Sequence, residues 1–383
     1  MGEEKFIKDL NIFNDLKLRI GAGVTGNQEI VSKISSTTMT AITGSSFDGG
    51  STTINGYTLV RTPNPKLKWE KTTQYDAGLD FGFFKGRLSG TLDVFSKITT
   101  DLMLYVQTKQ PSPTSYQYIN SDMNIYNKGV ELALNGVMIA KKDFNWSANV
   151  NFSKVNNKVD NMTEFLSIST GYASGPGITT AATQRIMNGY SLGTFWGKTF
   201  LGFDADGKSM FAKDANGTVI EGKIGSALPD FTYNFGTSLT WKQLDFSVNF
   251  NGVYGNEVYN NLGNLLNNMS NFSAGWNVVN SAIDKGEAKN NVLDYSSRYI
   301  EDGSYLRLAN ATIGYSFKMP KATYINKIRA YVSGNNLLTF TKYTGYDPEV
   351  NTTRISNSTP AMGIGWTNYP KARTFTVGLS VEL

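Results

Sequence analysis

The sequence predicts an all-β protein, a large antiparallel sheet that forms part of a transmembrane β-barrel with long extracellular loops. Three observations support this fold class. Aromatic residues make up 13 % of the chain, with 20 Tyr, 22 Phe and 38 Gly, a composition typical of strands and turns. Apolar and polar residues alternate with a period of two over many segments. Short and long connections between these segments alternate along the chain, as barrel turns and loops do.

The period-two alternation is clearest at the end of the chain. One face carries Phe375, Val377, Leu379, Val381 and Leu383, whereas Thr374, Thr376, Gly378, Ser380 and Glu382 form the other. The same pattern predicts ten long strands, at residues 16–24, 68–84, 87–106, 122–139, 144–153, 231–241, 244–258, 303–318, 326–341 and 374–383. Several exceed the usual strand length of about 5–6 residues and approach the roughly 9–11 that a tilted strand needs to cross a bilayer.

The connections between these strands fall into two length classes. The short ones are at 85–86, 140–142, 242–243 and 319–325, and the long ones at 25–67, 107–121, 158–229, 259–302 and 342–369. An eleventh strand pattern near 193–203 would break the up-and-down order, so we assign it to the long loop 158–229 as a small hairpin. Ten strands then place the C-terminus on the periplasmic side of an outer membrane.

Composition excludes several function classes. Cys and His are both absent, so disulfides, thiolate metal sites and a Ser-His-Asp triad are not available. The formal net charge of +5 is small and its Lys and Arg are scattered, which gives no nucleic-acid surface. No stretch reaches the roughly 20 apolar residues of a membrane helix. We therefore expect no enzyme, no catalytic or metal residues and no cofactor.

The first residues, Met1 to Phe6, lack the basic and apolar stretches of a secretory signal. Because the strands nevertheless predict a membrane barrel, we expect that the front of a longer chain is missing.

Several motifs resemble the SusC/RagA family of TonB-dependent outer-membrane transporters, and they occur in family order over nearly the whole chain. They read FNDLKLRIGAGVTGN at 13–27, NPKLKWEKT at 64–72, GLDFGFF at 78–84, RLSG at 87–90, YLRL at 305–308, IGYSF at 313–317, VSGNNLLT at 332–339 and GYDPE at 345–349. The chain is thus identified as the C-terminal portion, residues 1–383, of such a β-barrel domain.

The resemblance implies a 22-stranded barrel with an N-terminal plug, of which this chain would supply the last ten strands. It also implies import of glycans, oligosaccharides or peptides, with a SusD-like surface lipoprotein as lid. The TonB complex would act only through the missing N-terminal part, and outer-membrane lipid would surround the barrel of a Bacteroidetes-like Gram-negative cell. We expect the 383 residues alone to be inactive in transport.

Two groups of residues are candidate contact sites. The last strand resembles the signal that the barrel assembly machinery reads, carried by Thr376, Gly378, Val381 and Leu383; the alternative is an ordinary lipid-facing strand. Loop aromatics could contact a ligand or the lid, because rings offer large apolar area at low entropic cost. They are Tyr172, Tyr190, Trp196, Tyr259, Trp276, Tyr346, Trp366 and Tyr369. Loop packing is the alternative for each of them.

Other patterns have simpler explanations. Asp204–Lys208 and Asp214–Thr218 resemble fragments of calcium loops but lack a full ligand set, so we interpret them as turns. Aromatics at strand ends predict interfacial girdles: Trp69, Tyr75, Phe84, Trp146, Trp241, Tyr254, Tyr315 and Phe317. Inward polar residues are expected to face water or a plug rather than to catalyse: Asp76, Asp80, Glu131, Asn149, Asn234, Asn249, Asn251 and Arg329.

Two other hypotheses remain open. The chain could be a stand-alone structural or adhesive outer-membrane barrel, which an absent upstream plug sequence would favour. It could also be a soluble all-β binding protein, which monomeric solubility without detergent would favour. Neither alternative is an enzyme.

Overall fold

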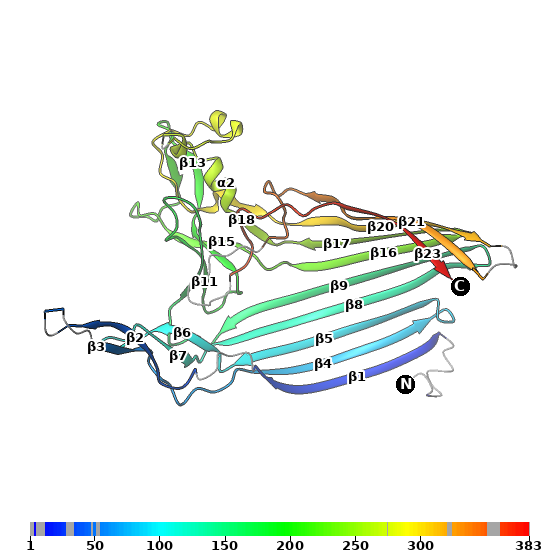
Figure 1. Cartoon of the computed structure of the whole chain (residues 1–383), viewed down its shortest axis with the longest axis horizontal. Coiled ribbons are helices and arrows are strands. Elements are labelled where there is room, and N and C mark those ends of the chain that lie inside the picture. Colours follow the sequence, from blue (N-terminus) through cyan, green and yellow to red (C-terminus); the bar gives the residue numbers. More distant parts are fainter. Residues whose placement is uncertain are drawn as a thin grey trace.

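The computed structural model describes residues 4, 12–27, 34–46, 49–50, 54–273, 275–319, 324–350 and 361–382. Its main feature is a curved antiparallel sheet, here called the wall (Figure 1). Ten strands form the wall in the order β1-β4-β5-β8-β9-β16-β17-β20-β21-β23. They are β1 (Phe13–Gly26), β4 (Lys71–Phe83), β5 (Leu88–Thr100), β8 (Asn124–Lys141), β9 (Phe144–Asp160), β16 (Phe231–Trp241), β17 (Leu244–Tyr254), β20 (Tyr305–Lys318), β21 (Lys327–Thr341) and β23 (Thr374–Glu382).

All ten predicted wall strands are confirmed, with shifted ends. The segment 87–106 is divided, because Asp101 has a φ of 55° and the wall strand stops at Thr100. The following residues form a separate hairpin of β6 (Met103–Gln107) and β7 (Tyr116–Asn120). Likewise 244–258 is divided between β17 and the short strand β18 (Glu257–Asn260). The wall is not closed, since β1 and β23 are its two edges.

The long connections carry smaller sheets. β2 (Thr38–Ser45) and β3 (Ile54–Arg61) form a hairpin that projects from the loop end of the wall (Figure 1). A four-stranded sheet contains β10 (Ile168–Tyr172), β11 (Ala182–Ile186), β12 (Thr194–Lys198) and β15 (Glu221–Ser226). β13 (Phe200–Phe203) pairs with β14 (Ser209–Phe211), and β18 lies between β19 (Ile300–Asp302) and β22 (Ile364–Gly365). The helical segments are α2 (Asn261–Leu266), α3 (Ser270–Ser273), η1 (Asn280–Lys285) and η2 (Ser297–Tyr299).

The eleventh strand pattern lies outside the wall, as predicted, but the expected single hairpin is wrong. Residues 194–203 contribute to two sheets, because β12 joins the four-stranded sheet and only β13 forms a hairpin. We call this assembly the loop body, comprising the segments between β9 and β16 and between β17 and β20, together with residues 361–366. Its core contains Phe195, Tyr259, Tyr295 and Ile364.

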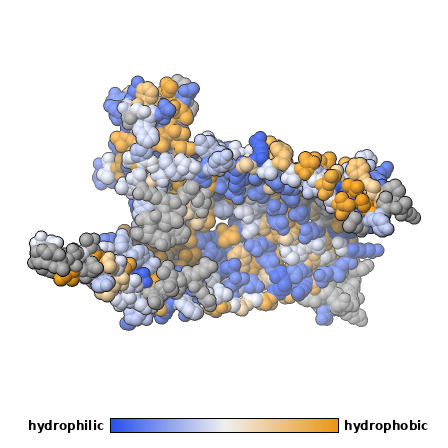
Figure 2. Space-filling view, viewed as in Figure 1, coloured by the Kyte–Doolittle hydropathy of each residue, from blue (hydrophilic) through white to orange (hydrophobic). Residues whose placement is uncertain are grey.

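The two faces of the wall differ in polarity. The convex face leaves large apolar side chains exposed, such as Val377 at 80 % and Phe375 at 71 %. All eight predicted girdle aromatics are exposed, from 40 % for Trp146 to 71 % for Phe84. Hydrophilic side chains cover much of the strand face turned to the viewer, while hydrophobic ones gather over β21 and β23 (Figure 2). Among the described residues, no helix is long and apolar enough to cross a membrane.

Turn chemistry places the short connections at one end of the wall. Phe84 and Lys85 between β4 and β5 have φ of 56° and 59°, and Gly86 follows at 78°, so the chain reverses within four residues. The last strand also ends there, because the backbone N–H of Asn326 donates to the carbonyl of Glu382 at 2.8 Å. The long loops gather at the opposite end (Figure 1).

Candidate functional site

The polar face of the wall is concave and is held by ion pairs between neighbouring strands. Arg19 of β1 donates from Nη2 to Asp80 of β4 and to Asp93 of β5, both at 2.9 Å. On the far side, Arg329 donates from Nε to Asp245 at 2.8 Å. Each pair joins two wall strands that are neighbours or next neighbours, at positions that the strand register places close together. The inward carboxylates of Asp80 and Asp245 are therefore each paired with an arginine side chain.

Asparagine forms a row between these ion pairs. The register places Asn135, Asn149, Asn249 and Asn310 in line across β8, β9, β17 and β20, with Gly236 of β16 in the same row. A Cβ at Gly236 would lie 2.3 Å from Asn149 Oδ1 and 2.6 Å from Asn249 Oδ1, so glycine is required for both amides to fit. The row is a surface of uncharged donors and acceptors, suited to water or to a polar solute.

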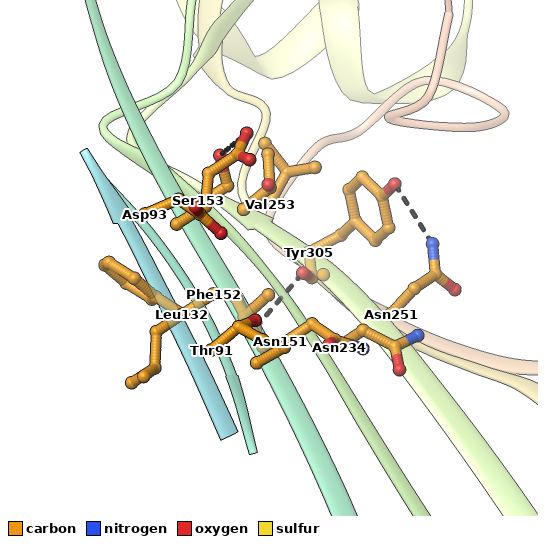
Figure 3. Close-up of a pocket in the computed structure, with 15 residues that line it drawn as sticks. Thr91, Asp93, Leu132, Asn151, Phe152, Ser153, Asn234, Asn251, Val253 and Tyr305 are labelled. Atoms are coloured by element: carbon orange, nitrogen blue, oxygen red, sulfur yellow. Dashed lines mark hydrogen bonds between the residues drawn. The ribbon is translucent and has the colours of Figure 1, made fainter. Parts of the chain in front are cut away.

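A depression of about 420 Å³ lies next to this row, toward the loop end (Figure 3). Its polar lining comes from six neighbouring strands and includes Asp93, Glu131, Asn151, Asn234, Asn251 and Tyr305. Ser153 donates to Glu131 at 3.4 Å, and Asn251 donates from Nδ2 to the hydroxyl of Tyr305 at 3.4 Å. The Tyr233 hydroxyl donates to the carbonyl of Tyr305 at 3.3 Å. Carboxylates and amides in this arrangement can bind hydroxyl or amine groups.

The structure confirms that Asp76 and Asp80 share a face, but they have different partners. Asp76 accepts a hydrogen bond from Gln74 at 3.2 Å, whereas Asp80 pairs with Arg19. The described residues contain no group of three or more His, Cys, Asp or Glu that could hold a metal ion. Asp204 and Asp214 each accept two backbone N–H groups within their own turn, the expected role of Asp in Asp-Gly and Asn-Gly loops.

A second cavity of about 510 Å³ lies in the loop region. It is lined by α2, by η2 and by the loop after β21, with Asn260, Arg298, Tyr299, Glu301 and Tyr346 among its walls. Glu301 is held by Asn260 at 2.9 Å and by Thr344 at 2.8 Å. Burial raises the pKa of Tyr299 well above its ordinary value. The Tyr299 hydroxyl is buried and has no hydrogen-bond partner among the described residues.

The eight loop aromatics proposed from the sequence have different environments. Tyr369, Tyr346 and Trp276 are exposed at 90 %, 63 % and 52 %. Tyr172 and Trp366 are half-buried, and Tyr190 meets Trp196 edge-to-face with ring centres 5.5 Å apart. Tyr259 is fully buried and accepts a hydrogen bond from Asn264 at 2.9 Å, so its role is core packing. The structure brings Tyr346 to the loop cavity and Trp366 to a small neighbouring one.

Three of the four residues of the predicted assembly signal, Thr376, Gly378 and Val381, lie on the last wall strand. Thr376 pairs with Ser333 on the concave face, and Val381 is 52 % exposed on the convex face. A Cβ at Gly378 would lie 2.4 Å from the ring of Tyr331, so this glycine accommodates an aromatic side chain of the neighbouring strand. Leu383 lies outside the described residues. Assembly through these residues remains a prediction.

Several residues of the site were not predicted. Asp93, Ser153 and Tyr305 line one depression only because strands far apart in the sequence pair, as β17 does with β20 through Val253 and Tyr305. For Asp93 and Ser153, the available signal was the period-two alternation of their strands, which places both side chains on the inward face. No local pattern indicated that the Arg307 side chain would be only 4 % exposed beside Asp347.

Comparison with known proteins identifies the fold and the family. The family described as "TonB dependent receptor-like, beta-barrel" matches residues 14–337. TonB-dependent receptor P3 of Formosa agariphila is 32 % identical over 418 residues, covering 100 % of this chain and 41 % of the relative. TonB-dependent receptor SusC of Bacteroides thetaiotaomicron is 30 % identical, covering 99 % and 39 %.

Solved structures agree with this result. The structure of the RagAB peptide transporter matches with a TM-score of 0.77 and 25 % identity, covering 98 % of this chain and 42 % of that one. A second structure, of the RagAB peptide importer in the closed-closed state, has a TM-score of 0.80 at 24 % identity. The chain thus spans about two fifths of the length of the proteins that it matches. From these matches and the ten-stranded wall, the chain belongs to the TonB-dependent receptor-like β-barrel family.

Proposed function

We propose that the chain is the wall and loop region of a TonB-dependent nutrient importer in the outer membrane of a Gram-negative bacterium. The observation that carries this proposal is the opposed polarity of the two wall faces. The convex face exposes apolar side chains such as Ile313 and Val332, while the concave face carries ion pairs and asparagines. Such a sheet is suited to lipid on one side and to a polar lumen on the other.

Closure of the barrel requires strands beside β1 and β23, because unpaired backbone groups are not tolerated in lipid. We propose that the remainder of the protein that contains this chain supplies them, together with the plug through which TonB acts. The short turns would face the periplasm and the loop body the outside. The C-terminal strand would then end on the periplasmic side and engage the barrel assembly machinery through Thr376, Gly378, Val381 and Leu383.

The nutrient is a glycan, an oligosaccharide or a peptide in this proposal, and a SusD-like lipoprotein covers the loop end. One solved relative is a peptide transporter, which supports the peptide alternative. Among the loop aromatics, Tyr346, Tyr369 and Trp276 are best placed to touch a ligand or the lid, because they are the most exposed. The luminal depression beneath the loops would lie on the route of the solute.

Uptake of labelled oligosaccharides and peptides by cells with and without the gene tests this proposal. We expect uptake of one class to be lost in the deletion strain and when the inner-membrane proton gradient is collapsed. The matched control is a strain that carries residues 1–383 alone with a cleavable signal peptide, which we expect not to restore uptake. Unchanged uptake of both classes in the deletion strain, or absence of the protein from purified outer membranes, would contradict the proposal.

A further inference from the structure

One ion-pair network joins the loop after β21 to the concave face of the wall. Arg307 of β20 donates from Nη2 to Asp347 at 2.6 Å, and its Nη1 lies 3.3 Å from Glu349. The backbone N–H of Glu349 also donates to Asp347 at 2.9 Å. Lys371 pairs with the same carboxylate oxygen, Oε2, of Glu349. The network therefore runs from a buried guanidinium to an exposed ammonium group.

The position of Arg307 shows that this loop folds inward. Arg307 is opposite Asn251 on β17 and Thr339 on β21, in the inward row, and lies two residues farther from the loop end than Tyr305. Asp347 follows the end of β21 by six residues, so the chain must turn back along the concave face to reach Arg307. Asn251 and Tyr305 both line the luminal depression (Figure 3), so the contact made by Arg307 lies beside the depression, at its β20 side.

The inward segment, residues 343–350, is fixed at three points. Tyr343 and Val350 pack with Val258 in a small buried cluster. The backbone N–H of Thr344 donates to Glu301 at 2.8 Å. The Arg307 side chain is 4 % exposed and that of Asp347 is 10 % exposed, so the ion pair is withdrawn from water. The apolar cluster is small, with three buried members, and removal of one partner of the buried ion pair would leave the other charge unpaired, which is strongly destabilising.

The Arg307 guanidinium is incompletely satisfied. Its Nε is buried and has no hydrogen-bond partner among the residues that the structure describes. The Tyr305 ring, 5.3 Å from the guanidinium carbon, covers one side of the group. A buried donor without a partner costs free energy in this arrangement, which lowers the stability of the closed state relative to an opened one. A contact of this kind is suited to two alternative positions of the segment.

We propose that residues 343–350 form a latch over the wall at Arg307, beside the luminal depression, with the Arg307–Asp347 ion pair as its catch. When the pair separates, the segment leaves the concave face and uncovers the wall at Arg307, next to the depression. The latch rests on the proposed function for its location outside the cell, but its opening is a property of the protein itself. Neutralising Asp347 therefore shifts the segment toward the open position.

The absence of Cys from the chain allows a direct test. The substitution Val350→Cys is introduced into the whole protein that contains this chain; the Val350 side chain that it replaces is only 8 % exposed. The rate at which this cysteine reacts with a membrane-impermeant maleimide is then measured in intact cells. We expect Asp347→Asn to accelerate this reaction at least about tenfold, because breaking a buried ion pair shifts a local opening equilibrium by that much or more. Lys371→Met removes only the exposed pair and is expected to change the rate less than about twofold.

Two further cysteines separate the possible outcomes. Val159→Cys, fully buried in a different cluster, must stay unreactive in the Asp347→Asn background. If Val159→Cys and Val350→Cys accelerate together, the ion pair holds the fold as a whole and the latch is refuted. Equal rates for Val350→Cys with and without the Asp347→Asn substitution would also refute it. Leu166→Cys, 92 % exposed, tests the location alone: failure to label it in intact cells contradicts the proposed function, and the latch comparison is then made in detergent.

Discussion

The wall and the loop body follow opposite rules of burial. Wall residues that are apolar are mostly exposed, as Val377 at 80 % and Ile20 at 79 % illustrate. In the loop body, Phe195, Tyr259 and Ala173 are fully buried around one core. The wall is held by backbone ladders and by inward ion pairs, and its apolar face needs lipid. The loop body is held by its own core, like a small water-soluble domain. Substitutions should therefore act differently in the two regions.

The largest expected effect is in the loop body. Phe195→Ala removes a fully buried ring and is expected to cost about 3–5 kcal/mol of local stability. Limited proteolysis should then cut the loop body, while the wall keeps its heat-modifiable gel mobility. Leu201→Ala, at a residue 60 % exposed in the same loop, is the matched control and should remain resistant. Loss of the heat-modifiable wall together with the loop body would show that the two regions are not separable.

Introducing a charged side chain into the wall should cost more stability on the convex face than on the concave face. Val332→Arg on the convex face is expected to cost about 2–4 kcal/mol in the membrane, because lipid cannot solvate the guanidinium. Ser333→Arg, the next residue and inward, should cost clearly less because it meets the polar lumen. Urea unfolding of the whole protein in lipid vesicles measures both. Similar losses would mean that the convex face does not contact lipid.

Alkaline pH should weaken the loop body before the wall. Burial raises the pKa of the loop-body residues Tyr259, Tyr295 and Tyr299 above their ordinary values. The protonated forms persist when folded, whereas the unfolded chain ionises above about pH 10. Stability is thus fully present below that pH and falls as pH rises through it.

Protease resistance of the loop body between about pH 8 and pH 11.5, a range that brackets the ordinary tyrosine pKa, measures this loss. Tyr299→Phe removes one ionisable hydroxyl that has no partner among the described residues, so it should reduce the loss without weakening the protein at neutral pH. An identical pH profile for Tyr299→Phe would argue against ionisation of this residue as a cause.

The smallest effect is expected at an exposed ion pair. Arg185 of β11 contacts Glu221 of β15 at 2.6 Å, but both side chains reach water, at 33 % and 43 %. Glu221→Gln should therefore change loop-body stability by less than about 1 kcal/mol. The temperature at which the loop body becomes sensitive to protease measures this change, and the shift caused by Phe195→Ala provides the scale. A loss as large as that of Phe195→Ala would place this pair among the main supports of the loop sheet.

Most of the wall could be predicted because its signal is local. Alternation in 374–383 or 231–241 depends only on neighbouring residues, and a wrong register would move every apolar side chain to the other face. The strand ends were less predictable. Asp101 ends β5 through a left-handed φ, although the alternation continues beyond it.

The sites depended on contacts that no local pattern carries. Gln184 donates to the carbonyl of Met362, 178 residues away, and so joins the loop sheet to the segment before β22. Tyr259 and Tyr346 are both loop tyrosines in sequence, yet one is fully buried and the other 63 % exposed. Only the packing of the loops around a common core separates them.

The sequence alone determined the all-β class, the ten wall strands, the polarity of their faces and the two lengths of connection. These properties follow from periodicity and turn residues, which are short-range. The tertiary structure decided the loop body, the depression beneath it and the inward position of residues 343–350 beside Arg307. Their free energy comes from burying groups that are distant in the chain, and the identity of such partners is fixed only when the strands and loops assemble.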